Sequence, residues 1–132
     1  MKVIDKIAWI EIQNKEILST RSKGRTKYYI PGGKREAHET DLQTLTREIK
    51  EELDVDLIAS TVMFVGLFQA QADSHAEGIQ VKMTCYSAKY NGTIKPSSEI
   101  EEVVWLKHED RPKVSPVDML IFDWLREQDL LK

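Results

Sequence analysis

The sequence predicts an α/β domain in which a mixed β-sheet lies between helices. Strand-like runs rich in β-branched residues come first, a helix pattern follows, and further strand-like runs precede a second helix pattern. This order of elements favours a sheet covered by helices. The chain has 132 residues, 41% of them hydrophobic, which is enough for one core without disulfides. We therefore expect a single domain over residues 1–132.

The first part of the chain predicts strands joined by polar loops. Residues 3–12 and 16–21 are apolar and rich in β-branched side chains, so we expect them to pair as a hairpin. Residues 28–30 should form a short strand. We expect it to end at Pro31, which lacks a ladder donor, and at Gly32 and Gly33, which admit turn dihedrals.

The second half predicts two long strands, a shorter strand and a helix. Residues 61–72 and 79–90 are strand-like and are joined by a polar loop that contains His75, a residue we interpret as solvated rather than substrate-binding. Residues 103–106 predict another strand. Ser115 followed by Pro116 is typical of a helix start, so a helix should run from there through at least Leu125.

The helix predicted from about residue 40 carries three glutamates beside its buried stripe. The stripe consists of apolar residues at spacings of three and four, namely Leu42, Leu45, Ile49 and Leu53. Glu48, Glu51 and Glu52 lie on an adjoining arc of about 100°. The neighbours of Glu48 at helical spacing are therefore other acids rather than Lys or Arg. Bound Mg²⁺ or Mn²⁺ would relieve the repulsion between these carboxylates. From the spacing alone, a metal site and a plain acidic surface are equally favoured.

The net charge of −3 conceals two segments of opposite sign. Residues 33–56 hold eight acidic and four basic residues, whereas residues 17–35 hold no acidic residue. A basic run that reaches the same cleft as the carboxylates would bind phosphate oxygens. Carboxylates that bind a cation and basic residues that bind phosphate together predict a polyphosphate site. Six charges on an acidic chain are too small a footprint for nucleic acid. The six are Arg21, Lys23, Arg25, Lys27, Lys34 and Arg35.

Composition also argues against a membrane or secreted protein. No apolar run approaches the ~20 residues of a transmembrane helix, and the first residues are strand-like rather than typical of a signal peptide. The single cysteine, Cys85, cannot form an internal disulfide, which fits a reducing compartment. It alternates with Val81 and Met83, so we expect it to be buried. We therefore expect a cytoplasmic protein without membrane contacts.

One spacing pattern resembles the Nudix box of the Nudix hydrolases. Gly33 is separated by five residues from Glu39, which is separated by seven residues from the segment 47–55, and proline and glycine stand in front of Gly33. Asp54 stands where the family has glycine, at a helix end that often needs left-handed dihedrals, which aspartate adopts at a cost of roughly 1 kcal/mol. The order of elements agrees with the Nudix fold, an α/β/α sandwich.

The resemblance implies a metal-dependent hydrolase. Glu48, Glu51, Glu52 and the carbonyl of Gly33 would bind Mg²⁺ or Mn²⁺. The implied reaction is attack of water on a phosphorus of a diphosphate linkage, in a nucleoside diphosphate joined to another group. Glu52, and after it Glu51, would be the general base.

Supporting and late acidic residues are implied as well. Glu39 and Arg47 would hold the loop and the helix carboxylates in place. A late glutamate often precedes the strand that carries a tryptophan in this family, and Trp105 has three such candidates. We favour Glu99 as a further metal ligand over Glu101 and Glu102, with an acidic loop as the alternative.

The expected substrate is a small nucleotide. Tyr28 and Tyr29 straddle the short strand, so one ring should face the cleft and could stack on a base. We expect Tyr29 to bind substrate together with Arg21, Lys23, Arg25 and Lys27. Some Nudix subfamilies that act on ADP-ribose or dinucleoside polyphosphates carry a proline or tyrosine shortly after the box. Neither residue stands there in this sequence, where the first later tyrosine is Tyr86. That favours nucleoside triphosphates, including oxidised ones, cleaved to a monophosphate and pyrophosphate.

Three other functions stay open from the sequence. One is a Nudix-fold sensor that binds a nucleotide without cleaving it, and another is a hydrolase of ADP-ribose or nucleotide sugars. The third is hydrolysis at the 5′ end of RNA. Nudix proteins often form dimers, so the resemblance is also compatible with a homodimer.

Overall fold

A mixed sheet forms the centre of the molecule. In the computed structural model, which describes residues 2–72 and 77–132, four strands form it in the order β4-β1-β7-β6. Strand β1 (Lys2–Trp9) pairs antiparallel with β4 (Gly32–Lys34) and parallel with β7 (Ile79–Ser87), which pairs antiparallel with β6 (Met63–Gln71). His75 lies outside the described residues.

Smaller sheets extend this centre. Strand β3 (Glu16–Ser22) lies between β2 (Ile12–Gln13) and β9 (Ile100–Leu106), and both pairings are antiparallel. The short strands β5 (Asp56–Leu57) and β8 (Tyr90–Asn91) pair with each other. The register of β3 with β9 places Arg21 opposite Glu102, which matters for the site.

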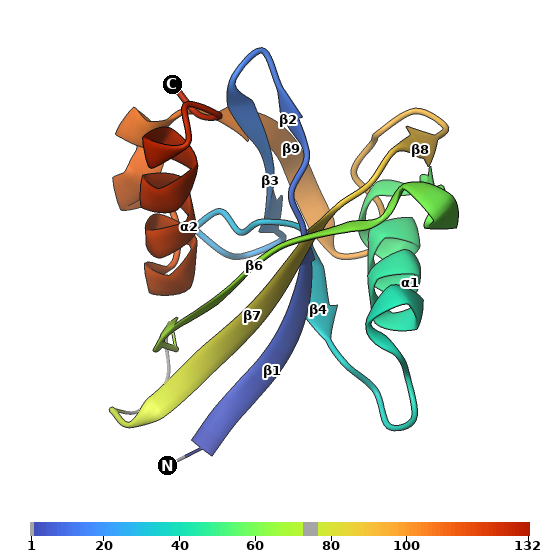
Figure 1. The fold of residues 1–132 in the computed structure, drawn as a ribbon, viewed down its shortest axis with the longest axis horizontal. Helices are drawn as coiled ribbons and strands as arrows, with labels where there is room; N and C mark the ends of the chain where they lie inside the picture. The colour runs from blue at the N-terminus through green and yellow to red at the C-terminus, as the bar shows by residue number, and fades with distance from the viewer. Residues whose placement is uncertain (1, 73–76) are drawn as a thin grey trace.

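Helices cover the strands from two sides, as Figure 1 shows. Helix α1 (Asp41–Leu53) packs against β4 and β1, and α2 (Pro116–Glu127) packs against β6 and β7. Two 3₁₀ helices in the described residues, η1 (Ala59–Thr61) and η2 (His108–Lys113), connect other elements. The predicted α/β fold with a mixed sheet between helices is confirmed.

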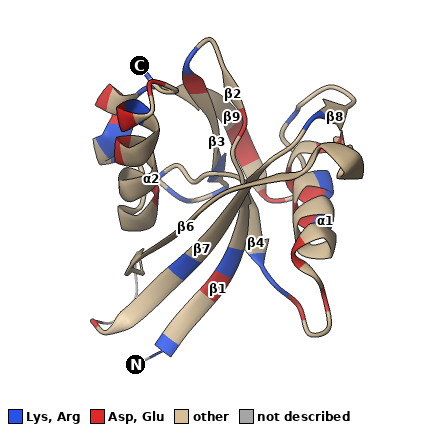
Figure 2. Cartoon of the chain, viewed as in Figure 1, with Lys and Arg blue, Asp and Glu red and all other residues tan. Residues whose placement is uncertain are grey.

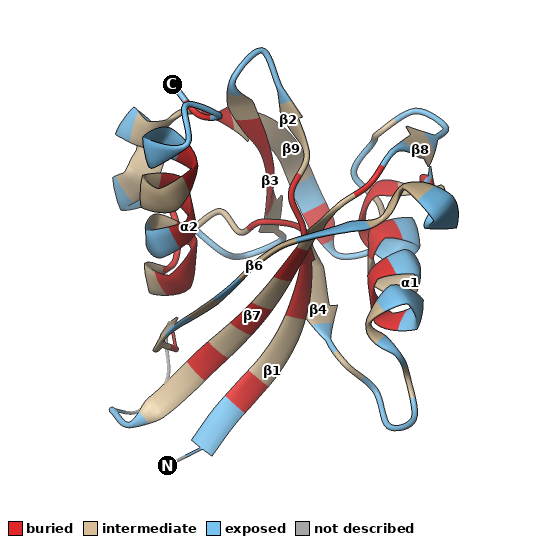
Figure 3. Cartoon of the chain, viewed as in Figure 1, coloured by how far each residue is buried: buried red, intermediate tan, exposed pale blue. Residues whose placement is uncertain are grey.

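Two hydrophobic clusters lie on opposite faces of β1. Ile7 and Trp9 belong to the cluster that contains the buried stripe of α1, whereas Ile4 and Ala8 belong to the cluster under α2. Figure 3 shows the buried residues of each helix on the side that faces the strands. Cys85 is fully buried in the α2 cluster, as predicted, and its burial raises the pKa of the thiol.

The predicted hairpin of residues 3–12 with 16–21 is confirmed only next to its turn, where residues 12–13 pair with residues 16–17, and is wrong for the rest of the first strand. Strand β1 pairs with β4 and β7, and β3 pairs with residues 12–13 and with β9. The reason is that β1 buries apolar side chains on both faces, which is typical of a central strand with a partner on each side.

The glycines expected to end a strand instead form one. Tyr28 and Tyr29 make isolated bridges, and β4 begins at Gly32. A Cβ on Gly32 would lie 2.1 Å from the carbonyl oxygen of Ile7, and its φ of +146° is one that side chains rarely adopt. Glycine is therefore what allows β4 to approach β1 closely.

Helix α1 begins and ends where the sequence predicts. Thr40 is its N-cap, with Gln43 completing a capping box through bonds of 3.2 and 2.9 Å. Its C-cap is Asp54, in the left-handed conformation at φ 56° and ψ 37°. No helix in the described residues is both long and apolar enough to cross a membrane.

Asp54→Gly and Asp54→Ala test the cost of that left-handed end. Both substitutions remove the carboxylate, so they differ in backbone freedom alone. We expect the glycine variant to be more stable than the alanine variant by about 1 kcal/mol, because alanine is strained at positive φ. Urea denaturation measures the difference, and equal midpoints would contradict the argument.

Candidate active site

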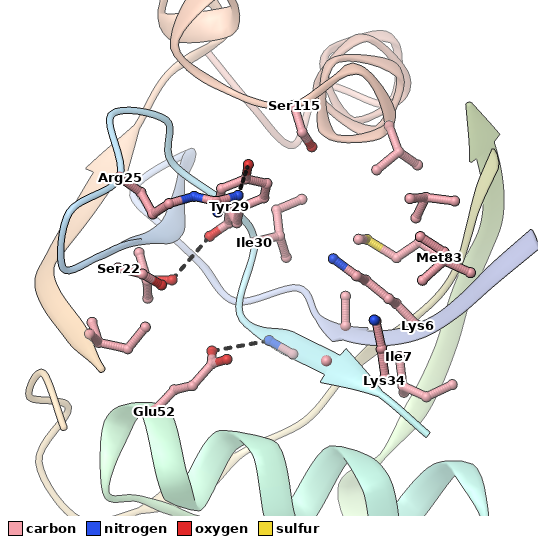
Figure 4. Close-up of a pocket in the computed structure, with 18 of the residues that line it drawn as sticks. Lys6, Ile7, Ser22, Arg25, Tyr29, Ile30, Lys34, Glu52, Met83 and Ser115 are labelled. Carbon is pink, nitrogen blue, oxygen red and sulfur yellow. Dashed lines mark hydrogen bonds between the residues drawn. The ribbon is translucent and has the colours of Figure 1, made fainter. Parts of the chain in front are cut away.

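A cavity of about 440 Å³ opens between α1, the central sheet and the start of α2 (Figure 4). This volume is within the ~300–1,000 Å³ typical of sites for small ligands. The cavity brings together residues that lie far apart in the sequence. Those among its walls that the sequence singled out are Lys23, Arg25, Tyr29, Gly33, Lys34, Glu52 and Glu99.

Glu52 is the buried acid of the cavity. Its side chain leaves the last turn of α1, and the residue is 9% exposed. The carboxylate accepts a hydrogen bond from the backbone N–H of Gly32 at 3.2 Å. Burial raises the pKa of Glu52 to about 8, and repulsion from Glu48 and Glu99 adds to that effect. The carboxylate thus lies where negative charge is poorly compensated.

Glu48 lies against the loop glycine. A Cβ on Gly33 would lie 2.4 Å from the Glu48 carboxyl group, so only glycine leaves room for that carboxylate. Burial raises the pKa of Glu48, while the hydrogen bond from Arg47 Nη1 at 2.6 Å lowers it. Glu52 and the two glycines line the cavity, and Glu48 lies directly behind Gly33 without lining it.

Arg47 connects helix α1 to the loop before it. Its Nε and Nη2 atoms donate to the two carboxylate oxygens of Glu39, each at 2.8 Å, and Nη2 also donates to the Lys34 carbonyl at 3.2 Å. Glu39 accepts a further bond from the Thr44 hydroxyl at 2.9 Å. This network fixes the positions of Gly33 and Glu48 relative to each other.

The other predicted acids differ in their surroundings. Glu51 is 53% exposed and does not line the cavity, whereas Glu99 does. Glu101 is exposed on β9. Glu102 instead accepts a hydrogen bond from the Tyr28 hydroxyl and pairs with Arg21 at 3.3 Å.

The donor set fits a hard divalent cation. Carboxylate and carbonyl oxygens are the ligands that Mg²⁺ and Mn²⁺ prefer, and the repulsion among Glu48, Glu52 and Glu99 is what a cation would relieve. Within the residues that the structure describes, no three acidic, His or Cys side chains already form a metal-binding group. The acids share one end of the cavity without being preassembled around an ion.

Some residues of the basic run line the cavity, and others lie outside it. Lys23 and Arg25 line the cavity, whereas Arg21 and Lys27 do not. Arg21 donates to the carbonyl of Arg25 at 3.1 Å and so holds the loop in place. Tyr29 lines the cavity and Tyr28 packs against the core under α2.

Lys6 and Ser115 are among the cavity residues that are missing from the sequence-based predictions. Lys6 lies on β1 between Ile4 and Ala8 on one strand face, and Ser115 precedes α2. A lysine in the middle of an apolar strand was the available signal for the first. Nothing in the sequence pattern distinguished Ser115 from an ordinary N-cap.

The family follows from this geometry and from comparison with known proteins. A family model described as NUDIX domain matches residues 5–125. The chain belongs to the Nudix family. As a Nudix hydrolase domain it acts on phosphoric anhydride bonds, and both the resemblance drawn from the box and the assignment as an enzyme are confirmed.

Solved structures share the Nudix fold over nearly the whole chain. The ORF135 protein of E. coli gives a TM-score of 0.73 at 26% identity, covering 96% of this chain and 92% of that protein. The MutT NUDIX hydrolase of Burkholderia pseudomallei gives 0.76 at 19% identity over 93% and 98%. A UDP-X diphosphatase gives 0.68 at 16% identity over 98% and 64%. Comparison with curated proteins gives no match.

The Glu39–Arg47 pair predicts a pH dependence of stability. Hydrogen bonds from Arg47 lower the pKa of Glu39 from 4.5 to about 2. A carboxyl group whose pKa is lower in the folded than in the unfolded state stabilises the fold at any pH above its unfolded-state pKa. This contribution is lost as the pH falls through the folded-state pKa. Wild type should therefore be more stable than Glu39→Gln above about pH 4.5, with the advantage shrinking towards pH 2.

Urea denaturation at stepped pH measures that difference. Glu127→Gln, an exposed substitution at the end of α2, is the matched control. A constant difference between wild type and Glu39→Gln from pH 7 to pH 2 would contradict the role given to the pair.

Proposed function

We propose that this Nudix domain is a Mg²⁺- or Mn²⁺-dependent pyrophosphohydrolase of nucleoside triphosphates, including oxidised ones. The products are a nucleoside monophosphate and pyrophosphate. One observation carries the proposal: one cavity has the buried carboxylate of Glu52 and the exposed Glu99 on its wall, together with cations and an aromatic ring. Figure 2 shows acidic residues along α1 and the loop before it, and basic residues on the neighbouring strands.

The acidic end is where the cation would be held. Glu48, Glu52 and the Gly33 carbonyl are the proposed ligands, and we propose Glu51 and Glu99 as further ligands. A bound divalent ion lowers the pKa of water and neutralises charge on phosphate oxygens.

The cavity's own side chains bind substrate and move a proton. Lys23, Arg25 and Lys34 line the walls, and their N–H groups would donate to phosphate oxygens. A Glu52 carboxylate oxygen is the proposed acceptor of the proton from the attacking water, because this carboxylate lines the cavity and is the most buried of the acids on α1. Glu51 is the next candidate. Arg21, Glu39 and Arg47 act as positioning residues.

Glu52→Gln tests the catalytic proposal. The amide keeps the shape but cannot take a proton, so we expect kcat for a nucleoside triphosphate with Mg²⁺ to fall by about 10²–10⁴. Removal of the metal with EDTA should abolish turnover in wild type. Glu109→Gln, an exposed change in η2, is the control and should keep wild-type kcat.

Pyrophosphate release from a nucleotide panel decides between the remaining functions. A sensor would bind nucleotides with no release from any of them. Release of a sugar phosphate from a nucleotide sugar, or of ribose phosphate from ADP-ribose, would favour the other hydrolase reactions. Unchanged turnover in Glu52→Gln would overturn the assigned base. Nucleoside triphosphates are cytoplasmic, and we place the protein there as part of the proposal.

A further inference from the structure

The end of the cavity away from the acids contains a lysine in an apolar setting. On β1, Lys6 shares a strand face with Ile4 and Ala8, which are 8% and 0% exposed and belong to the core under α2. Burial lowers the pKa of Lys6, and Asp118 acts in the opposite direction. A lysine held on a buried strand face at a cavity wall is costly, which points to a ligand.

The ammonium group of Lys6 has donors left for that ligand. Its Nζ lies 5.9 Å from the centre of the Tyr29 ring, a cation–π contact. A ring face takes no ordinary hydrogen bond, and the negative charges of Asp118 and Glu52 raise the pKa of Lys6 and so favour its charged, donating form. The group offers three N–H donors and no acceptor.

Ser115 adds a second polar group to the same end. It is 3% exposed, and although it is the N-cap of α2 its side chain makes no capping bond. Among the described residues its Oγ has no hydrogen-bond partner. Figure 4 shows the Ser115 hydroxyl and the Lys6 side chain directed into the cavity from different walls. A buried hydroxyl without a partner is unfavourable, so a ligand that bonds it gains affinity.

Apolar side chains form the walls between these two groups. Ile30, Met83 and Val117 line the cavity there. A flat apolar ring with a polar edge fits such a space. In a nucleotide whose phosphates lie at the acidic end, that ring is the base.

We propose that Lys6, assisted by Ser115, selects nucleotides whose base carries a ring carbonyl. Guanine, cytosine and uracil present a carbonyl oxygen that accepts from an ammonium group. Adenine has no carbonyl: where guanine has its carbonyl oxygen adenine has an amino group, whose N–H donors face those of Lys6, so that only its ring nitrogens accept. The inference rests on the proposed function and deepens it by naming the class of base.

The test compares four nucleotides in wild type, Lys6→Met and Ser115→Ala. Methionine keeps the length and apolar stem of lysine without its donors. We expect wild type to show higher kcat/KM for GTP, CTP and UTP than for ATP with Mg²⁺. In Lys6→Met the GTP/ATP ratio should fall by about 10- to 100-fold, and in Ser115→Ala by a smaller factor. Lys2→Met, an exposed change earlier on β1, should keep the ratio.

Binding of the monophosphates separates this inference from the proposed function. Calorimetry with GMP, CMP, UMP and AMP reads base preference without turnover, so it applies even if no triphosphate is cleaved. Absence of turnover together with a Lys6-dependent preference for GMP over AMP would overturn the function and support the base selection. An equal loss for all four nucleotides in Lys6→Met, or no preference in wild type, would overturn the base selection.

Discussion

The close approach of two glycines to their neighbours is the constraint on which the site depends. Gly32 lies so near Ile7 that a Cβ would meet its carbonyl at 2.1 Å, and Gly33 lies so near Glu48 that a Cβ would meet its carboxyl at 2.4 Å. Strand β4 is thereby held between β1 and α1. The same placement points the Gly32 N–H at Glu52 and the carbonyl of Lys34, two residues further along, at Arg47. One backbone segment thus connects the sheet, the helix acids and the arginine that positions them.

Electrostatics then divides the cavity into two ends. The acids of α1 lie at one end, where burial and mutual repulsion raise the pKa values of Glu48 and Glu52. Arg47 lies behind them and bonds Glu39 on its far side, so it leaves the buried Glu52 without a direct cationic partner. An arrangement that stabilised the fold alone would pair these acids with lysines at helical spacing. Arg47 pairs with Glu48, but Glu52 has no ion pair among the described residues, and this buried, uncompensated carboxylate is the physical sign of a ligand site.

The sequence was informative where structure is local and less so where it depends on distant pairing. The stripe and acids of α1, its Thr40 cap and the left-handed Asp54 follow from spacings within one segment. The partners of β1 do not, because strand order depends on residues about 75 positions away in β7. The same limit applies to Arg21, which the sequence predicted to bind phosphate. Its partner Glu102 is set by the register of β3 with β9, which no local pattern reveals.

Lys6 shows how the two ends of the cavity are coupled. Its positive charge lowers the pKa of Glu52, and the negative charge of Glu52 raises that of Lys6, so each favours the charged form of the other across the cavity. Phosphates bound at the acidic end would bring further negative charge towards Lys6 and strengthen its charged, donating form. The group proposed to select the base would then be most strongly charged when the polyphosphate is in place. Strand β1 can hold it there because both of its faces are anchored, by the α1 cluster on one side and the α2 cluster on the other.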